Sequence, residues 1–340
     1  MSKKNSNVIL KKFFEEFSNI SKIYSDFKKK LDSIKSENFL VAISGGPDSL
    51  ALTALSKAYS HETKRKVYYV LINHNIRKNS SNEAHKVKTL LKKYKINLKV
   101  ISNKRKIERN IQSQARKIRY DYLKKYCLEK KIQTVLTAHN LEDQVETFFI
   151  RLSRGSGLTG LSSIQPLTKL NDKVKLFRPL LDIEKKYLIF TAKKIFGKFF
   201  VDPSNNNEKY LRTKIRNLKK TLNQSGIKYN QIIKSINNLA SSKATLDEYF
   251  ERIFNEVTNR SQATFNIRLD KFSKMNKEIK MRIINESIKK IKKNYYNPRS
   301  KKVLNLIKNL DSKDFRGATL GGCKFFIKKG KLCLKLEKNN

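Results

Sequence analysis

A short apolar run that leads directly into a glycine turn is the feature that most constrains the fold. Phe39 to Ile43 is continuously apolar and of strand length, Ser44-Gly45-Gly46-Pro47-Asp48-Ser49 follows at once, and Leu50 to Tyr59 has the character of a helix. A fully apolar strand is typical of a parallel sheet that is covered on both faces. The segment therefore predicts a strand, a turn and a helix at the centre of an α/β domain.

The same strand and helix alternation recurs further along the chain. Alternating units of this kind predict a doubly wound parallel sheet. We expect further strands at residues 67–72, 97–101 and 134–138, and further helices at residues 82–94, 111–131 and 141–153.

The two ends of the chain have other patterns. Residues 1–38 carry apolar residues at helical spacing and predict a helical extension that ends near Ser36. The turn-rich segment Asp202 to Asn207 marks the edge of the sheet domain, and residues 209–307 are basic and mostly helical in pattern. Alternation around Lys329-Gly330 predicts a terminal β-hairpin. We expect a catalytic domain at 1–218 and a basic, mainly helical domain at 219–340.

The charge of the chain indicates a polyanionic partner. Lys and Arg number 76 against 29 Asp and Glu, which leaves a net charge of +47. Nucleic-acid binding explains this excess, and an A/T-rich genome that favours lysine codons is the alternative. No apolar run approaches the roughly 18 residues of a membrane span, and the first residues lack a signal-peptide pattern. We expect a cytoplasmic protein that does not enter a membrane, and the oligomeric state stays open between monomer and homodimer.

The three cysteines, Cys127, Cys323 and Cys333, are widely spaced and form no CxxC pair. This spacing predicts neither a disulfide framework nor a structural zinc site. We expect them to be packed thiols without chemistry.

The glycine turn has the chemistry of a phosphate site. Backbone amides after a parallel strand and the N-terminus of the next helix favour an anion, and Gly45 and Gly46 allow close approach. Ser44 and Ser49 add hydroxyl donors, and Pro47 is counted with them in the phosphate-binding loop. The segment lacks the Gly-Lys-Ser/Thr of a Walker A loop. Asp48 beside a pyrophosphate requires a cation between them, which predicts Mg²⁺.

Charged residues of the second half of the sheet domain complete the candidate site. Asp143 and Glu146 lie at i,i+3 on one helix face, where they can bind an ammonium group and take its proton; acids that answer the helix dipole are the alternative. His139 ends the strand before that helix, and its place beside the acidic pair favours contact with phosphate or base; a hydrogen-bonded polar residue without a role in the chemistry is the alternative. Candidate cations for the α-phosphate and substrate, with a solvated charged surface as the alternative, are Arg116, Arg119, Arg212 and Arg216.

Several motifs in order resemble the PP-loop ATP pyrophosphatase superfamily and, within it, the tRNA(Ile)-lysidine synthetase family. The first is the Ser-Gly-Gly-x-Asp-Ser loop at residues 44–49. The resemblance runs over about residues 38–218, with Asn73 and Asn75 as departures from the family pattern, and it is weaker beyond. The later motifs are Asn73 to Ser80, Gln114 to Tyr120, His139 to Thr147, Arg151 to Leu161, Arg178 to Leu181, Asp202 to Asn205 and Thr319 to Cys323.

The resemblance implies an ATP-dependent ligase, in which the basic residues 219–340 would be the tRNA-binding domain. The cytidine at the wobble position of a CAU-anticodon tRNA(Ile) would attack the α-phosphate of ATP, and free L-lysine would then displace AMP at C2. ATP with Mg²⁺ would bind at residues 44–49, with Asp48 as the metal ligand. Lysine and the reacting groups would meet Asp48, Arg116, Arg119, His139, Asp143, Glu146 and Arg212.

Two other functions stay open. A tRNA thiolase of the same superfamily is disfavoured because thiolases usually use paired cysteines or an iron–sulfur cluster, and this chain has no CxxC. A catalytically silent RNA-binding protein is disfavoured because Asp48, Asp143 and Glu146 are all present.

Overall fold

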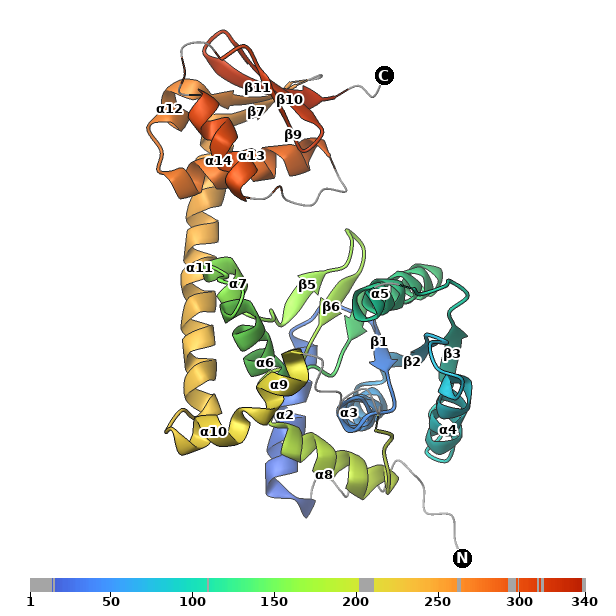
Figure 1. The fold of residues 1–340 in the computed structure, drawn as a ribbon. Coiled ribbons are helices and arrows are strands. Elements are labelled where there is room, and N and C mark those ends of the chain that lie inside the picture. Colours follow the sequence, from blue (N-terminus) through green and yellow to red (C-terminus); the bar gives the residue numbers. More distant parts are fainter. Residues whose placement is uncertain are drawn as a thin grey trace, which may run out of the picture. The chain divides into compact units, whose positions relative to one another are not determined.

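The computed structural model divides into two compact units, residues 1–240 and 241–340 (Figure 1). Each unit is described by itself. The structure describes residues 14, 16–108, 110–201, 211–261, 264–292, 298, 300–310, 312 and 315–337. The Asp202 to Asn205 motif therefore lies outside the described residues.

The first unit contains a six-stranded sheet in the order β3-β2-β1-β4-β6-β5. β1 pairs in parallel with both β2 and β4, and β3 and β6 continue the parallel pairing on either side. The chain moves outward from β1 in one direction and then returns to its other side, so the predicted doubly wound sheet is confirmed. The strands are β1 (Asn38–Ile43), β2 (Lys66–Asn73), β3 (Leu98–Ser102), β4 (Thr134–Leu136), β5 (Leu167–Lys169) and β6 (Lys175–Phe177).

Helices cover both faces of this sheet, as the continuously apolar strands require. Phe39 and Val41 face a core formed with α2, α3, α4 and α8, whereas Leu40 and Val135 face α5 through Leu123. The helices are α2 (Ser18–Asp32), α3 (Pro47–Thr63), α4 (Ser80–Lys92), α5 (Ile111–Glu129), α6 (Leu141–Leu152), α7 (Leu158–Leu161) and α8 (Lys185–Phe196).

Two differences from the sequence-based expectations concern the sheet edge and the N-terminal helix of the first unit. β5 and β6 are absent from the prediction because each has three residues, too few to give a periodic signal, and β5 runs antiparallel to β6 at the sheet edge. The helical extension ends earlier than predicted: α2 stops at Asp32, and the Ser33 amide donates to the Lys29 carbonyl.

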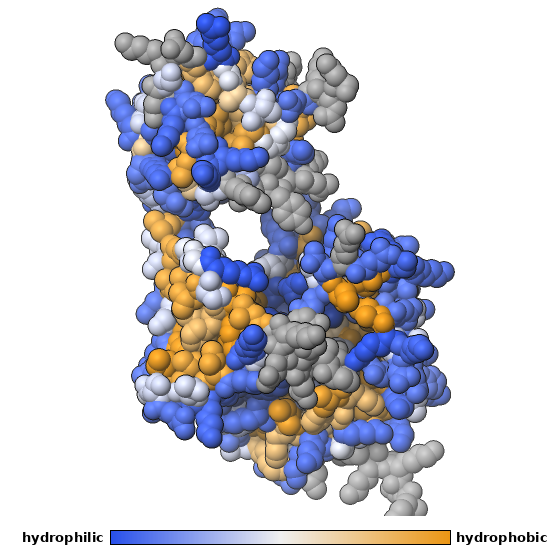
Figure 2. Space-filling view, viewed as in Figure 1, coloured by the Kyte–Doolittle hydropathy of each residue, from blue (hydrophilic) through white to orange (hydrophobic). Residues whose placement is uncertain are grey.

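The first unit extends past the boundary that the sequence suggests at residue 218. Tyr229, Ile232 and Ile236 pack on Val145 of α6, and this apolar contact joins the start of the long helix to the sheet unit. Figure 2 shows apolar residues over α6 and over the start of the long helix, α11. The functional division at residue 218 stays a prediction. The helices concerned are α9 (Leu211–Asn217), α10 (Lys219–Gln224) and α11 (Tyr229–Val257).

The second unit is an antiparallel sheet covered by helices on one face. The predicted terminal hairpin is confirmed as β10 and β11, and it belongs to a five-stranded sheet in the order β7-β8-β11-β10-β9. Residues 209–307 are therefore not helical throughout, because β7 and β8 interrupt them. The elements are β7 (Thr258–Arg260), β8 (Phe265–Arg268), α12 (Leu269–Ser273), α13 (Lys277–Ile291), α14 (Ser300–Leu310), β9 (Ala318–Leu320), β10 (Cys323–Lys328) and β11 (Lys331–Leu336).

Candidate active site

The candidate site lies at the carboxyl edge of the first sheet, where β1 and β4 are neighbours. The chain changes direction across the sheet between these two strands, and such a switch point is where open α/β sheets bind ligands. The loop at residues 44–49 follows β1, and residues 137–140 follow β4. Tertiary structure thus brings the two strongest sequence motifs to one edge.

Gly45 gives the loop a shape that other residues cannot adopt. Its φ is +87°, and a Cβ built there would lie 2.6 Å from Cγ2 of Val87. Its carbonyl accepts a hydrogen bond from the Phe200 amide at 3.0 Å. The glycine is therefore required both by its left-handed backbone and by the close approach of α4.

The hydroxyl of Ser49 has a different role from the phosphate donor that the sequence suggests. Ser49 Oγ accepts from the amides of Ser44 at 3.2 Å and Gly45 at 3.1 Å, and it donates to the Gly46 carbonyl at 3.0 Å. These bonds hold the loop closed. The first-turn amides of α3, which have no intrahelical acceptor, remain to bind an anion.

Asp48 is a carboxylate that lacks the partners its burial demands. Its Oδ1 is buried without a hydrogen-bond partner, and the nearest cation is Lys185, whose Nζ lies 3.9 Å from Oδ2. Burial raises the pKa of Asp48 to about 6, and Lys185 and the Asn140 side chain act in the opposite direction. A buried carboxylate oxygen with a free lone pair beside an anion site fits a Mg²⁺ ligand.

The N-termini of three helices meet around Asp48. Asn140 caps α6, with its Oδ1 accepting from the Asp143 amide at 3.0 Å and Asp143 Oδ2 accepting from the Asn140 amide at 3.1 Å. Glu142 Oε2 accepts from the Lys185 amide, which begins α8, at 2.9 Å. The positive ends of α3, α6 and α8 therefore favour an anion at this edge. Asp143 Oδ2 therefore acts as an acidic group at the positive end of α6, as the helix-dipole alternative predicts for this residue.

Glu146 is buried and held by two arginines of α9. Its side chain is 2% exposed, Arg216 Nε donates to Oε1 at 2.8 Å, and Arg212 Nε lies 3.2 Å from Oε2. Burial raises the pKa of Glu146 above its ordinary value, and the hydrogen bond and charge of Arg216 oppose this rise. The sequence grouped Arg212 and Glu146 in one site, and the structure brings them into contact.

Two histidines at this edge are held neutral. Burial lowers the pKa of His139 to about 4, with the charges of Arg178 and Arg116 acting in the same direction and Asp143 opposing them. Its Nδ1 lies 2.9 Å from the Thr137 hydroxyl. His139 is therefore a neutral hydrogen-bonding group at pH 7.

His74, which follows β2, was not among the predicted site residues. Burial and then the charge of Arg119 lower its pKa to about 4, and both ring nitrogens are buried without a partner. The sequence feature that could have identified His74 is its position in the Asn73 to Ser80 motif, directly after a predicted strand. Arg116 thus lowers the pKa of His139, whereas Arg119 lowers the pKa of His74. The Arg116 guanidinium also lies 5.1 Å from the Tyr120 ring centre.

Other motif residues hold the segment that follows α6. Arg178 donates to the Gln165 carbonyl at 2.7 Å, and Arg151 donates to the Gly160 carbonyl at 2.7 Å. Gln144 pairs with both backbone groups of Ile164. These contacts fix the segment between α6 and β5. Arg151 and Arg178, from the motifs at 151–161 and 178–181, therefore have a structural role.

Lys185 was missed because a lysine in so basic a chain carries no signal of its own. A weak hint is its place shortly after the Arg178-Pro179 motif, which follows β6. Cys127, Cys323 and Cys333 are buried free thiols, as expected, and burial raises the pKa of Cys127 to about 12.

Within the described ranges no group of three or more His, Cys, Asp or Glu side chains could hold a metal, and no helix is long and apolar enough to cross a membrane.

Comparison with known proteins places this geometry in a family. A PP-loop domain model matches residues 18–222. A protein of Wolbachia pipientis wMel named tRNA(Ile)-lysidine synthase is 34% identical over 84% of this chain and 67% of its own length. One of the same name from Orientia tsutsugamushi (strain Boryong) is 42% identical over 54% of this chain and 41% of its own length. The chain thus spans about two thirds or less of these relatives.

A solved structure agrees at the level of the fold. The U34-tRNA thiolase NcsA from Methanococcus maripaludis, with its 4Fe-4S cluster, superposes with a TM-score of 0.55 at 19% identity. The match covers 65% of this chain and 78% of the thiolase. At this identity the likeness concerns the sheet and its covering helices.

Proposed function

The chain belongs to the tRNA(Ile)-lysidine synthase family of PP-loop proteins, and on this premise we propose that it attaches lysine to C2 of the wobble cytidine of a CAU-anticodon tRNA(Ile). One observation carries the proposal. The anion-binding loop after β1 and the carboxylates after β4 lie at one sheet edge, so a triphosphate and an amine can bind side by side.

In the first step, the cytidine O2 forms a bond to the α-phosphorus of ATP and pyrophosphate leaves. The loop at residues 44–49 and the start of α3 bind the departing phosphates. Asp48 would hold Mg²⁺, which would offset the phosphate charge. Arg116 and Arg119 lie on the α5 face of this edge, where their charges can stabilise the adenylated cytidine.

In the second step, the lysine ε-nitrogen forms a bond to C2, the C2–O2 bond breaks and AMP leaves. Only the neutral amine is nucleophilic, so a carboxylate must first take a proton from the ammonium group. Asp143 is the first contact in this proposal, because Glu146 is already ion-paired with Arg212 and Arg216, whereas the hydrogen bond that Asp143 accepts comes from the neutral Asn140 amide. His139, which is neutral, can hydrogen-bond the base or phosphate without adding charge.

The experiment is lysine transfer by the purified full chain. With ATP, Mg²⁺, radiolabelled lysine and a CAU-anticodon tRNA(Ile), label should enter the tRNA, and the tRNA mass should rise by one lysine less one water. Asp48→Ala should abolish transfer while tRNA affinity is retained. Binding of tRNA without any transfer of label would favour a silent RNA-binding protein instead.

A further inference from the structure

The second unit has a strongly cationic sheet face. In antiparallel strands, directly paired residues point to the same side. The register puts Cys323, Phe325, Leu332 and Leu334 on the face that packs against α12, α13 and α14. The other face carries Lys324, Phe326 and Lys328 of β10, Lys331, Cys333 and Lys335 of β11, and Asn266 and Arg268 of β8.

Like charges lie directly opposite one another on this face. Lys328 pairs with Lys331, Lys331 also pairs with Arg268, and Lys324 pairs with Lys335. Such pairs repel and destabilise a sheet. Among the described strand residues of this face there is no Asp or Glu, and Arg268 finds its acid, Asp270, outside the strands. The arrangement costs stability that a bound polyanion would restore.

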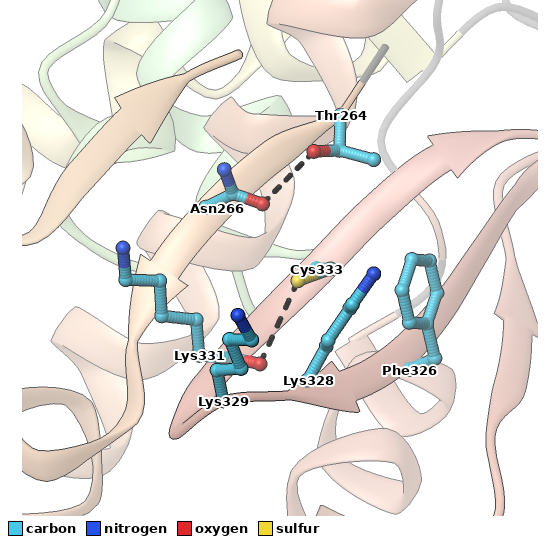
Figure 3. Close-up of a pocket in the computed structure, with 7 residues that line it drawn as sticks. All are labelled: Thr264, Asn266, Phe326, Lys328, Lys329, Lys331 and Cys333. Atoms are coloured by element: carbon cyan, nitrogen blue, oxygen red, sulfur yellow. Dashed lines mark hydrogen bonds between the residues drawn. The ribbon is translucent and has the colours of Figure 1, made fainter.

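A hollow on this face has the size and lining for a nucleotide. Its volume is about 250 Å³, and its lining combines cations with an aromatic ring and amide and hydroxyl groups. Figure 3 shows these side chains over β8, β10, β11 and the turn that joins the last two strands. A neighbouring hollow of about 680 Å³ shares Asn266, Lys329 and Lys331, and its lining adds Arg268 together with two acids, Glu256 and Asp270. The residues of the first hollow are Thr264, Asn266, Phe326, Lys328, Lys329, Lys331 and Cys333.

We propose that this face, defined by Arg268, Lys324, Phe326, Lys328 and Lys331, binds the sugar-phosphate backbone of tRNA and stacks Phe326 on an unpaired base. Lysines that face one another across strands can bracket phosphates, and a ring between them offers a stacking surface. Lys335 Nζ lies 5.7 Å from the Phe326 ring centre. This ammonium group can therefore bind the phosphate of the nucleotide whose base stacks on the ring. The inference rests on the proposed function only for the identity of the RNA.

The test compares two triple variants of the full chain with equal charge loss. Lys324→Gln, Lys328→Gln and Lys331→Gln change the sheet face, and Lys301→Gln, Lys302→Gln and Lys308→Gln change exposed lysines of α14 in the same unit. The sheet variant should bind tRNA at least about tenfold more weakly and lower the salt slope by about two to three. The helix variant should lose less than about threefold. Equal losses in both variants would overturn the proposal.

Stability provides a second readout with the opposite sign. Because the sheet variant removes like-charge pairs, its melting temperature should stay the same or rise while its affinity for tRNA falls. A fall in both would mean that the variant damages the fold and that these lysines act structurally. Phe326→Leu, which keeps an apolar side chain at this position, should weaken binding about fivefold or more without changing the salt slope. Unchanged affinity would show that Phe326 does not stack on a base.

Binding is measured without ATP or lysine, which separates this proposal from the proposed function. If wild-type protein transfers no lysine but the sheet variant alone loses tRNA, the cationic face stands and the ligase assignment fails. If wild-type protein transfers lysine and the sheet variant binds tRNA normally, the ligase assignment stands and the cationic face is wrong.

Discussion

Arg216 donates from Nε to Oε1 of Glu146 at 2.8 Å, and this bond joins α9 to α6 across the candidate site. Glu146 is 2% exposed and Arg216 is 38% exposed. The pair is therefore a buried carboxylate held by a cation at the surface. It fixes the acid in place and also limits its freedom to act as a base.

Arg216→Ala should destabilise the protein, because it leaves Glu146 charged and buried with Arg212 as its remaining cation. We expect the free energy of unfolding to fall by about 1–3 kcal/mol, measured by urea denaturation. The double variant Glu146→Gln with Arg216→Ala should recover part of this loss, because an amide needs no counter-ion. Additive losses in the double variant would contradict the coupling.

Gly45→Ala should disrupt the loop, because its Cβ would meet Val87 and its φ is positive. Gly155→Ala is the matched control: φ there is +64°, and nothing lies within 4 Å of the new Cβ. The control should lose about 1 kcal/mol of stability from backbone strain, and Gly45→Ala should lose more. Calorimetry should also show weaker ATP binding for Gly45→Ala alone. Equal effects would mean that the contact with Val87 is unimportant.

Lys185→Ala should weaken ATP binding by about five- to tenfold, because it removes the cation that faces Asp48 and the loop. Lys186→Ala removes the same charge from the next residue, whose ammonium pairs with Glu184 and whose side chain is 63% exposed. This control should bind ATP like the wild type in titration calorimetry with Mg²⁺. A similar loss in both variants would point to net charge instead of position.

His74→Phe should make the protein less sensitive to acid. The folded-state pKa of His74 is lowered to about 4, below the ordinary value near 6.5, so between these pH values the unfolded chain binds the extra proton. Stability is therefore lost as the pH falls through this window. Because the ring is partly exposed to solvent, we expect less than the full shift implies: from pH 7 to pH 4.5 the wild type should lose about 1–2 kcal/mol more than the variant in urea denaturation. Parallel pH curves would show that His74 is not held neutral by the fold.

The sequence predicted the central sheet well because its strands are continuously apolar and punctuated by glycine or polar turns. β5 to β9 were not predicted because these strands have three or four residues and lie outside any longer apolar run. β4 is equally short, but it lies in the apolar segment at residues 134–138 that the sequence shows. The loop residues 44–49 were recognised from their order alone. His74 and Lys185 were not, because each becomes notable only through what surrounds it in space.

The order of residues determined the strand, turn and helix units and placed Asp48, His139 and Asp143 at strand and helix ends, because local periodicity and backbone preferences act over a few neighbouring residues. Tertiary structure decided which of these ends meet. It put Arg216 on Glu146, used the Ser49 hydroxyl to close the loop, and left Oδ1 of Asp48 without a partner. Burial and charge depend on residues far apart in the chain, so no local pattern could have contained them.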